Sequence, residues 1–258
     1  MSRTRVSGPS FNAGSMALMA HAEHSEATVA EEEYLQVIFW LREAGLPMTG
    51  ANVARAMQVS APTVHEMIRR LESDGYVTRK GDKSLSFTNT GQEHAEGIVR
   101  RHRLIERFLT DVFDIPWDQV HEEAERLEHW MSPTVEERML NAIGDAQTCP
   151  HGHPIFTERR EQGVPLADVE EGAEVRVLRF ENEAEDLLHY LMDSGLTPGL
   201  RGNLSESGDE MVSIDVDGKL HTVTRSVAET VSVVADPSPP PRTALPESLV
   251  LAKEHWGR

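Results

Sequence analysis

Residues Thr49 to Thr88 read TGANVARAMQVSAPTVHEMIRRLESDGYVTRKGDKSLSFT, and this segment contains two predicted helices followed by a predicted hairpin. Its first part predicts a short helix that begins at Thr49 and extends to Met57. Ser60 then caps a second helix, and Pro62 lies in the first turn of that helix. Two helices joined by such a tight turn form a helix-turn-helix.

A β-hairpin is predicted directly after the second helix. Tyr76–Thr78 and Leu85–Thr88 read as short strands, and the turn between them, Arg79–Ser84, carries three basic side chains. A helix-turn-helix followed by such a hairpin is typical of a winged helix. A winged helix can bind DNA or serve only for contacts with other proteins.

In the DNA-binding interpretation, the second helix enters the major groove and the basic turn grips the phosphate backbone. The partner is then a double-stranded operator, and a two-fold operator requires a homodimer. The predicted DNA contacts are Ser60, Pro62, Thr63, His65, Glu66 and Arg69 on the helix, and Arg79, Lys80 and Lys83 on the turn.

The charge of the chain is distributed unevenly. Over 258 residues the formal net charge is −18, which by itself disfavours nucleic acid. Between Gly50 and Ile105, however, nine Lys and Arg outnumber six Asp and Glu, and this locally basic segment is compatible with DNA binding. No apolar run approaches the roughly 18 residues of a membrane span, so we expect no membrane association. The single cysteine, Cys149, suits a reducing cytoplasm, where we expect the protein to act.

Helices are predicted on both sides of the winged helix. One begins at Glu31, and a second starts with a capping box at Thr90–Glu93 and reaches Val112. On this second helix His102 and Glu106 are four residues apart and share a face, a spacing that ordinary surface contacts also produce. The apolar faces within Leu109–Ile143 are too large for so small a bundle, so we predict a dimer interface there. The alternative is that these helices simply pack on the winged helix.

A further predicted helix, Val120–Met131, concentrates ligand-type side chains. His121, Glu125, Glu128 and His129 recur at the spacing of successive helical turns, so all four leave one side of the helix. Two imidazoles and two carboxylates on one buried face would be satisfied by a divalent cation. A solvated face of a Glu-rich helix is the alternative.

Cys149, His151 and His153 are also ligand-type residues, in the sequence CPHGHP. The two prolines and the glycine favour a rigid turn instead, and no fourth ligand stands nearby in the sequence. From Val164 onward short alternating strands surround one predicted helix, Glu183–Ser194, which indicates a small barrel-like β domain.

Taken together, the chain resembles the diphtheria toxin repressor family of metal-dependent transcriptional repressors. The resemblance covers roughly residues 30 to 156, and three motifs carry it: Ser60–Val64 (SAPTV), Arg101–Arg107 (RHRLIER) and Val120–His129 (VHEEAERLEH). A weaker likeness covers the family's C-terminal SH3-like domain. The expected fold is a mainly α N-terminal part, a winged helix-turn-helix plus a helical dimerisation domain, followed by a small SH3-like β-barrel.

The domain boundaries expected on this basis follow the changes in composition. They are 1–29 for a flexible extension, 30–96 for the winged-helix DNA-binding domain, 97–156 for the helical metal-binding and dimerisation domain, 164–235 for the SH3-like domain and 236–258 for a Pro-rich tail.

The resemblance implies two adjacent metal sites in each subunit. It places His102, Glu106 and His121 in an ancillary site, to which Glu181 or Glu183 of the SH3-like domain would add a ligand. It places Glu33, Glu125, Glu128 and His129 in a regulatory site.

The choice of ion follows from two of these positions. Glu125 stands where iron-type members have cysteine, and Glu33 stands where they have methionine. Carboxylates in place of soft sulfur ligands favour a harder ion, so we expect Mn²⁺ first and Fe²⁺ second. Gln36 and Ile105 stand where the manganese type has further carboxylates, so its paired-manganese geometry is not expected here.

The function implied is repression of metal-uptake genes, with metal ordering the dimer for operator binding. A helical di-metal enzyme is the rival interpretation, because Glu and His on facing helices also build oxidases and hydrolases. The chain lacks paired Glu-x-x-His motifs and shows no nucleophile or phosphate-binding loop, so we expect neither enzymatic activity nor a small-molecule substrate. A winged-helix regulator indifferent to metal remains a third possibility.

Overall fold

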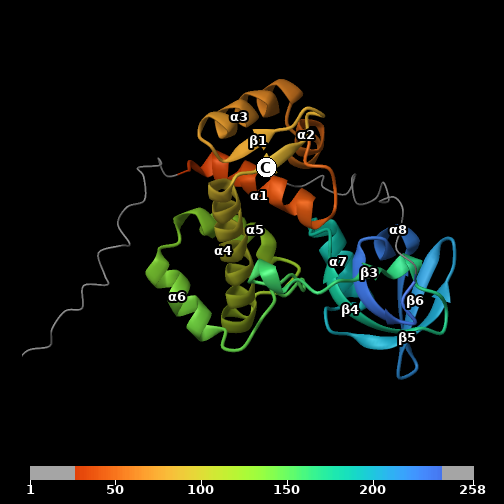
Figure 1. Ribbon diagram of the computed structural model, residues 1–258. Coiled ribbons are helices and arrows are strands. Elements are labelled where there is room, and N and C mark those ends of the chain that lie inside the picture. Colours follow the sequence, from red (N-terminus) through yellow and green to blue (C-terminus); the bar gives the residue numbers. More distant parts are fainter. Residues whose placement is uncertain (1–26, 240–258) are drawn as a thin grey trace, which may run out of the picture.

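The computed structural model describes residues 27–239, so the expected N-terminal extension and Pro-rich tail lie largely outside the described residues. Three parts follow one another along the chain: a winged helix, a helical part and a β-sheet part (Figure 1). No described helix combines the length and the apolar character that crossing a membrane requires.

The winged helix is built from three helices and a hairpin, as expected. Helix α1 spans Val29–Glu43, α2 spans Gly50–Met57 and α3 spans Ala61–Ser73; strands β1 (Val77–Arg79) and β2 (Leu85–Phe87) pair antiparallel. The Ser60 hydroxyl accepts the Thr63 N–H at 3.3 Å, which is the predicted helix cap. The turn between α2 and α3 is closed by Gln58 in a left-handed conformation, with φ of 53°.

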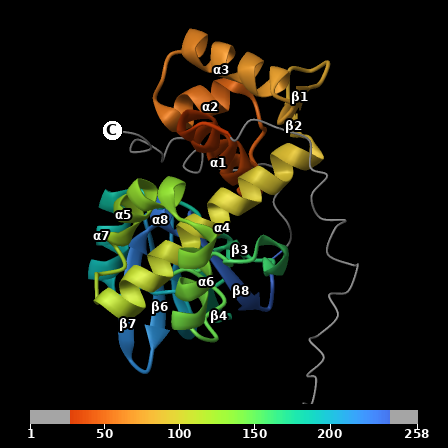
Figure 2. The same ribbon diagram turned by 90° about the vertical axis from the view of Figure 1, so that its left-hand side faces the viewer.

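The long helix α4, Asn89–Phe113, leaves the winged helix and becomes the central element of the helical part (Figure 2). The predicted capping box at Thr90–Glu93 is wrong by two residues, because the hydroxyl of Thr88 accepts the Gly91 N–H at 3.0 Å. Gly91 cannot be exchanged for a larger residue, since a Cβ there would lie 1.8 Å from the carbonyl oxygen of Tyr76. This close approach fixes the start of α4 against the hairpin.

Two further helices complete the helical part: α5, Val120–Leu127, and α6, Pro133–Ala142. The prediction of one helix over Val120–Met131 is wrong at its end. The α-helix stops at Leu127, and Glu128–Trp130 form a 3-10 turn (η2). His121 Nε2 lies 3.5 Å from Oε1 of Glu125 one turn further along α5, whereas Glu128 and His129 stand on the 3-10 turn.

The C-terminal part is a six-stranded antiparallel sheet with the strand order β3-β8-β4-β5-β6-β7. Its strands are β3 (Val164–Pro165), β4 (Glu174–Phe180), β5 (Arg201–Ser207), β6 (Met211–Val216), β7 (Lys219–Thr224) and β8 (Val231–Asp236). Helices α7 (Glu185–Ser194) and α8 (Arg225–Ala228) and a 3-10 turn, Leu166–Asp168 (η4), accompany the sheet. Strand β5 buries only Leu204 and α8 is a single turn, so neither element carries a strong sequence signal.

An ion-pair network joins the sheet to the other two parts. Arg160, in the segment before β3, donates to the carbonyl of Glu43 at 3.2 Å and pairs with Glu181 at 2.8 Å. Glu43, at the end of α1, also pairs with Arg103 of α4, and both side chains are buried. The winged helix, the helical part and the sheet therefore meet at one set of buried charges.

Candidate metal centre

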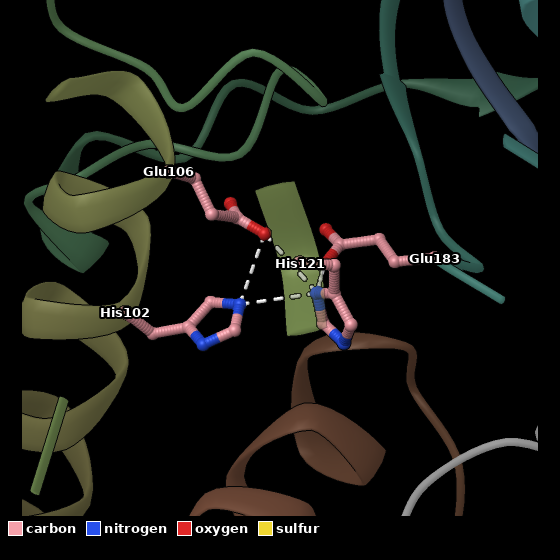
Figure 3. Close-up of side chains that lie close together, drawn as sticks. All are labelled: His102, Glu106, His121 and Glu183. Atoms are coloured by element: carbon pink, nitrogen blue, oxygen red, sulfur yellow. Dashed lines mark hydrogen bonds and ion pairs between the residues drawn. The ribbon is translucent and has the colours of Figure 1, made fainter. Parts of the chain in front are cut away.

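Three side chains from two helices converge in the helical part (Figure 3). His102 and Glu106 lie one turn apart on α4, and His121 lies at the start of α5. Nε2 of His102 is 3.0 Å from Oε1 of Glu106 and 3.1 Å from Nδ1 of His121. His121 Nδ1 is 3.1 Å from the same Glu106 oxygen. The three residues that the sequence assigns to one site thus present their donor atoms to one point.

The C-terminal part supplies a fourth ligand-type residue to this point. Glu183 lies between β4 and α7, and its Oε2 is 3.0 Å from Nδ1 of His121. The other candidate, Glu181, pairs with Arg160 at 2.8 Å and with Arg179 at 2.7 Å. Of the two carboxylates proposed from the sequence, Glu183 therefore lies at the cluster, whereas Glu181 forms ion pairs with two arginines instead. His102, Glu106, His121 and Glu183 have ligand atoms that all lie within 4.8 Å of one another.

The CPHGHP segment forms the expected turn and also approaches the cluster. The Cys149 N–H donates to the His153 carbonyl at 2.8 Å, and Gly152 has a φ of 92°. The same turn brings His151 Nδ1 to 3.2 Å from Glu106 Oε1, and Cys149 joins Glu106 and His151 in a second set of close ligand atoms. Sequence reasoning missed these contacts, although one cysteine and two histidines within five residues were a visible signal.

The histidines and carboxylates of this cluster shift the pKa values of one another and of Cys149. Although burial alone would lower it, the carboxylates of Glu106 and Glu128 raise the pKa of His102 well above its ordinary value. Burial also lowers the pKa of His121. Hydrogen bonds to Glu106 and Glu183 outweigh burial and raise this pKa to about 10. Burial and the Glu106 carboxylate raise the pKa of the Cys149 thiol to about 11.

The residues present fit a divalent cation. Glu106 is fully buried, yet its Oε2 has no hydrogen-bond partner among the described residues. An unpaired buried carboxylate oxygen is costly, whereas a bound cation satisfies it directly. Imidazole nitrogens and carboxylate oxygens are ligands that suit Mn²⁺, Fe²⁺ and Zn²⁺. Such a donor set is what a metal centre requires, whereas a packed polar core would leave this Glu106 oxygen unpaired.

The residues assigned to the regulatory site are near one another but are not joined in the same way. Desolvation, with the carboxylates of Glu125 and Glu128, raises the pKa of Glu33, and His129 acts in the opposite direction. No direct contact of Glu33 with these residues is formed within residues 27–239. His129 Nδ1 instead lies 2.8 Å from Oε2 of Glu32, its neighbour on α1. The predicted regulatory cluster is thus not closed, and Glu32 is a contact that the sequence did not reveal.

Helix α1 nevertheless contacts the metal centre. Glu128 Oε2 lies 2.7 Å from Nδ1 of His102 and accepts the side-chain N–H of Gln36 at 3.1 Å. The Trp40 ring lies with its centroid 5.5 Å from that of His102. A helix of the winged-helix part therefore touches the outer side of a candidate ligand.

The predicted DNA contacts all lie at the protein surface. Pro62, Thr63 and His65 are exposed on α3. Arg69 pairs with Glu66 at 3.3 Å, and Arg79 pairs with Glu72 at 3.0 Å. The remaining predicted contacts, Ser60, Lys80 and Lys83, are exposed as well.

Several large apolar side chains are exposed on the helical part, within the region predicted to form a dimer interface, and together they are called the apolar patch below. None of the residues of α6 is buried, and Trp130 is 80% exposed. The large apolar side chains exposed here are Val112, Phe113, Leu127, Trp130 and Val135. A lone subunit would expose them to water, so a second subunit is their expected cover.

Family models match all three parts. Residues 27–85 match the iron-dependent repressor N-terminal DNA-binding domain, and residues 88–157 match the iron-dependent repressor metal-binding and dimerisation domain. Residues 164–235 match the FeoA domain.

Whole proteins of similar sequence and structure are transcriptional regulators rather than enzymes. The chain is 32% identical over 226 residues to the iron-dependent repressor IdeR of Mycobacterium tuberculosis, covering 81% of this chain and 98% of the relative. It is 41% identical over 124 residues to the diphtheria toxin repressor of Corynebacterium diphtheriae, covering 48% of this chain and 55% of the relative. A solved manganese-dependent transcriptional repressor in complex with manganese has a TM-score of 0.72 at 29% identity, covering 80% of this chain and 99% of that one. The chain therefore belongs to the iron-dependent repressor family, the family of the diphtheria toxin repressor.

Proposed function

We propose that this metal-dependent, DNA-binding repressor senses Mn²⁺, or Fe²⁺ as the second choice, and represses genes for metal uptake. The observation that carries the proposal is the contact chain from His102 through Glu128 to Gln36. It links a candidate metal ligand to the first helix of the DNA-binding domain through contacts of 2.7 and 3.1 Å.

The ancillary ion would be held by His102, Glu106, His121 and Glu183. A bound ion supplies positive charge that satisfies the buried carboxylates. If His102 held the ion through Nε2, its Nδ1–H would donate to Glu128 and fix the orientation of that carboxylate. Glu128 would then hold Gln36, and with it α1, at a defined angle to the helical domain.

The regulatory ion would be held by Glu33, Glu125, Glu128 and His129. Support comes from the mutual repulsion of these carboxylates, which a cation would replace by attraction. His129 would leave its contact with Glu32, and Glu32 would keep its ion pair with Arg101 at 2.9 Å. Three carboxylates and one imidazole make a harder ligand set than one with cysteine and methionine, which favours Mn²⁺.

DNA binding would follow from ordering two subunits. Each α3 would enter a major groove, and the basic turn between β1 and β2 would contact phosphates. A dimer joined through the exposed apolar patch on α4, α5 and α6 would set the spacing of the two recognition helices. Metal binding to the ordered form would shift the population toward it, and a hundredfold gain in affinity requires about 2.7 kcal/mol of coupling.

The test is a titration of the protein's own promoter DNA, followed by fluorescence anisotropy, with chelator, Mn²⁺, Fe²⁺ or Zn²⁺. We expect operator affinity to rise strongly with Mn²⁺, less with Fe²⁺ and least with Zn²⁺, while DNA of scrambled sequence shows no such rise. Equal affinity with chelator and with all three ions would contradict the proposal and favour a regulator indifferent to metal.

A further inference from the structure

The turn after α6 adds a second set of donors to the same buried carboxylate. Cys149 and His151 are fully buried and, with Glu106, offer three ligand atoms within 4.8 Å of one another. His151 Nδ1 lies 3.2 Å from Glu106 Oε1 and 3.7 Å from Glu183 Oε2. His151 therefore lies close to both carboxylates of the first set, Glu106 and Glu183.

Glu106 is the point that the two sets share. Its Oε1 has three imidazole nitrogens within 3.0 to 3.2 Å, those of His102, His121 and His151. Its Oε2 is fully buried and has no hydrogen-bond partner among the described residues. Because nitrogens of both sets approach the same oxygen, Oε1 is the atom that would bridge two ions, and Oε2 is left free to bind either of them.

A single ion would leave part of this donor set unused. Bonds of about 2.0 to 2.3 Å limit the ligands of one ion to separations of roughly 4.6 Å, because opposite ligands are at most two bond lengths apart. Cys149 falls outside the set of His102, Glu106, His121 and Glu183 that satisfies such a limit. The thiol and His151 therefore belong to a second position beside the first.

We propose that this pocket holds two divalent ions, one at His102 and His121 and one at Cys149 and His151, with Glu106 bridging them and Glu183 lying beside both. The proposal rests on the proposed function, which assigns the first of these positions. On binding the second ion, the Cys149 thiol releases its proton to solvent and bonds through its thiolate. Two carboxylates and one thiolate then face two dications, so the buried charge is nearly neutral.

The two positions differ in chemical character. The first offers only nitrogen and oxygen, which suits Mn²⁺ or Fe²⁺. The second includes a soft sulfur ligand, which favours Fe²⁺, Zn²⁺ or Co²⁺ over Mn²⁺. The pocket would therefore bind two different ions preferentially, and the softer one would occupy the position formed by the turn.

The experiment uses the full chain under anaerobic conditions with Co²⁺ as the probe. Bound cobalt is counted by mass spectrometry, and the absorption spectrum is searched for a thiolate-to-cobalt charge-transfer band. The variants are Cys149→Ser, His151→Gln and His121→Gln. His189→Gln, a change at a 44% exposed histidine on α7, is the matched control.

We expect the wild type and His189→Gln to show the band. Cys149→Ser and His151→Gln should each lower the count by one cobalt per chain, and Cys149→Ser should lose the band. His121→Gln should also lose one cobalt but retain the band, because Cys149, His151 and Glu106 remain. Circular dichroism identifies any variant that fails to fold. The absorption spectrum of the cobalt-loaded wild type tests the thiolate ligand without any substitution.

A wild type without the band, or a Cys149→Ser variant with an unchanged cobalt count, would overturn the two-ion pocket. Neither result would affect the proposed function, which is tested separately by metal-dependent operator binding of the wild type. A wild type that shows the band but no metal-dependent operator binding would instead contradict the proposed function.

Discussion

Nδ1 of His102 lies 2.7 Å from Oε2 of Glu128, and both side chains are buried. The opposite nitrogen of His102 faces Glu106 and His121, whereas Glu128 faces Gln36 of α1 and lies 3.4 Å from His129. The contact between these two residues therefore joins the ancillary cluster directly to a regulatory residue, and His121 makes a second, longer contact of 3.5 Å with Glu125. It gives a physical reason for one site to influence the other.

Replacing Gln36 by Met should separate metal binding from its effect on DNA. The variant loses the 3.1 Å hydrogen bond to Glu128 but keeps every candidate ligand. We expect metal affinity, measured by calorimetry, to change by less than threefold, while the gain in operator affinity on adding Mn²⁺ falls about tenfold, or roughly 1.4 kcal/mol. A variant with the full gain would show that Gln36 does not transmit the signal.

The apolar patch on the helical part predicts a specific loss of dimerisation. Val135→Glu places a charge at a 44% exposed position within the patch, and such a charge would be costly to bury against a second subunit. We expect analytical ultracentrifugation to find a monomer, and operator affinity should fall with the dimer. The matched control is Leu220→Glu on β7, a 58% exposed leucine outside the patch, which should remain dimeric.

A Val135→Glu protein that is as dimeric as the Leu220→Glu control would place the interface elsewhere.

The winged helix predicts two kinds of DNA contact. Lys80 is exposed on the basic turn, so Lys80→Ala should weaken binding to all sequences alike and reduce the salt dependence by about one counterion. His65 is exposed on α3, so His65→Ala should reduce discrimination between operator and scrambled DNA. Affinities measured over a range of salt concentrations distinguish the two effects; the same salt slope in Lys80→Ala and wild type would exclude a phosphate contact there.

The buried pair of Glu43 and Arg103 predicts a loss of stability that depends on pH. Burial alone would raise the pKa of Glu43, but the charge and hydrogen bond of Arg103 outweigh burial and lower this pKa. A lowered carboxylate pKa adds stability above the ordinary value of 4.5, and this stability is lost as the pH falls through the lowered pKa. Removing one partner of such a pair costs about 3 to 5 kcal/mol, because the other charge stays buried and unpaired.

Urea unfolding of Glu43→Gln at pH 7 should therefore show a large loss of stability relative to Glu93→Gln, a change at an exposed carboxylate on α4. At acid pH the difference between the two variants should shrink. If the difference in stability between the two variants did not change with pH, the negative charge of Glu43 would not be the source of the stability that the pair provides.

Much of the fold follows from local sequence signals. The helix-turn-helix is marked by a cap at Ser60 and a proline at Pro62, both of which act within one turn of chain. Strand β5 carries no such signal, because it buries only Leu204 and its other side chains face outward. The end of α5 at Leu127 also escapes prediction, since nothing in the sequence forbids the helix from continuing into Glu128.

The candidate site was predictable only where its residues share an element or a recognisable motif. His102 and Glu106 are one turn apart on α4, and the resemblance adds His121 on the next helix. Cys149 and His151 lie more than 40 residues from Glu106, and only the packing of the turn against α4 brings them together. The choice between Glu32 and Glu33 depends on the rotation of α1, which the sequence does not fix to within one residue.

We propose that metal acts on DNA binding through Glu128. The most direct test compares the operator affinity of Glu128→Ala, with and without Mn²⁺, with that of Glu122→Ala, whose glutamate is exposed on α5 and pairs with Arg126. We expect the wild type and Glu122→Ala to gain about a hundredfold in affinity with Mn²⁺, or roughly 2.7 kcal/mol, and Glu128→Ala to gain little. A Glu128→Ala protein that responds to Mn²⁺ as fully as Glu122→Ala would contradict this proposal.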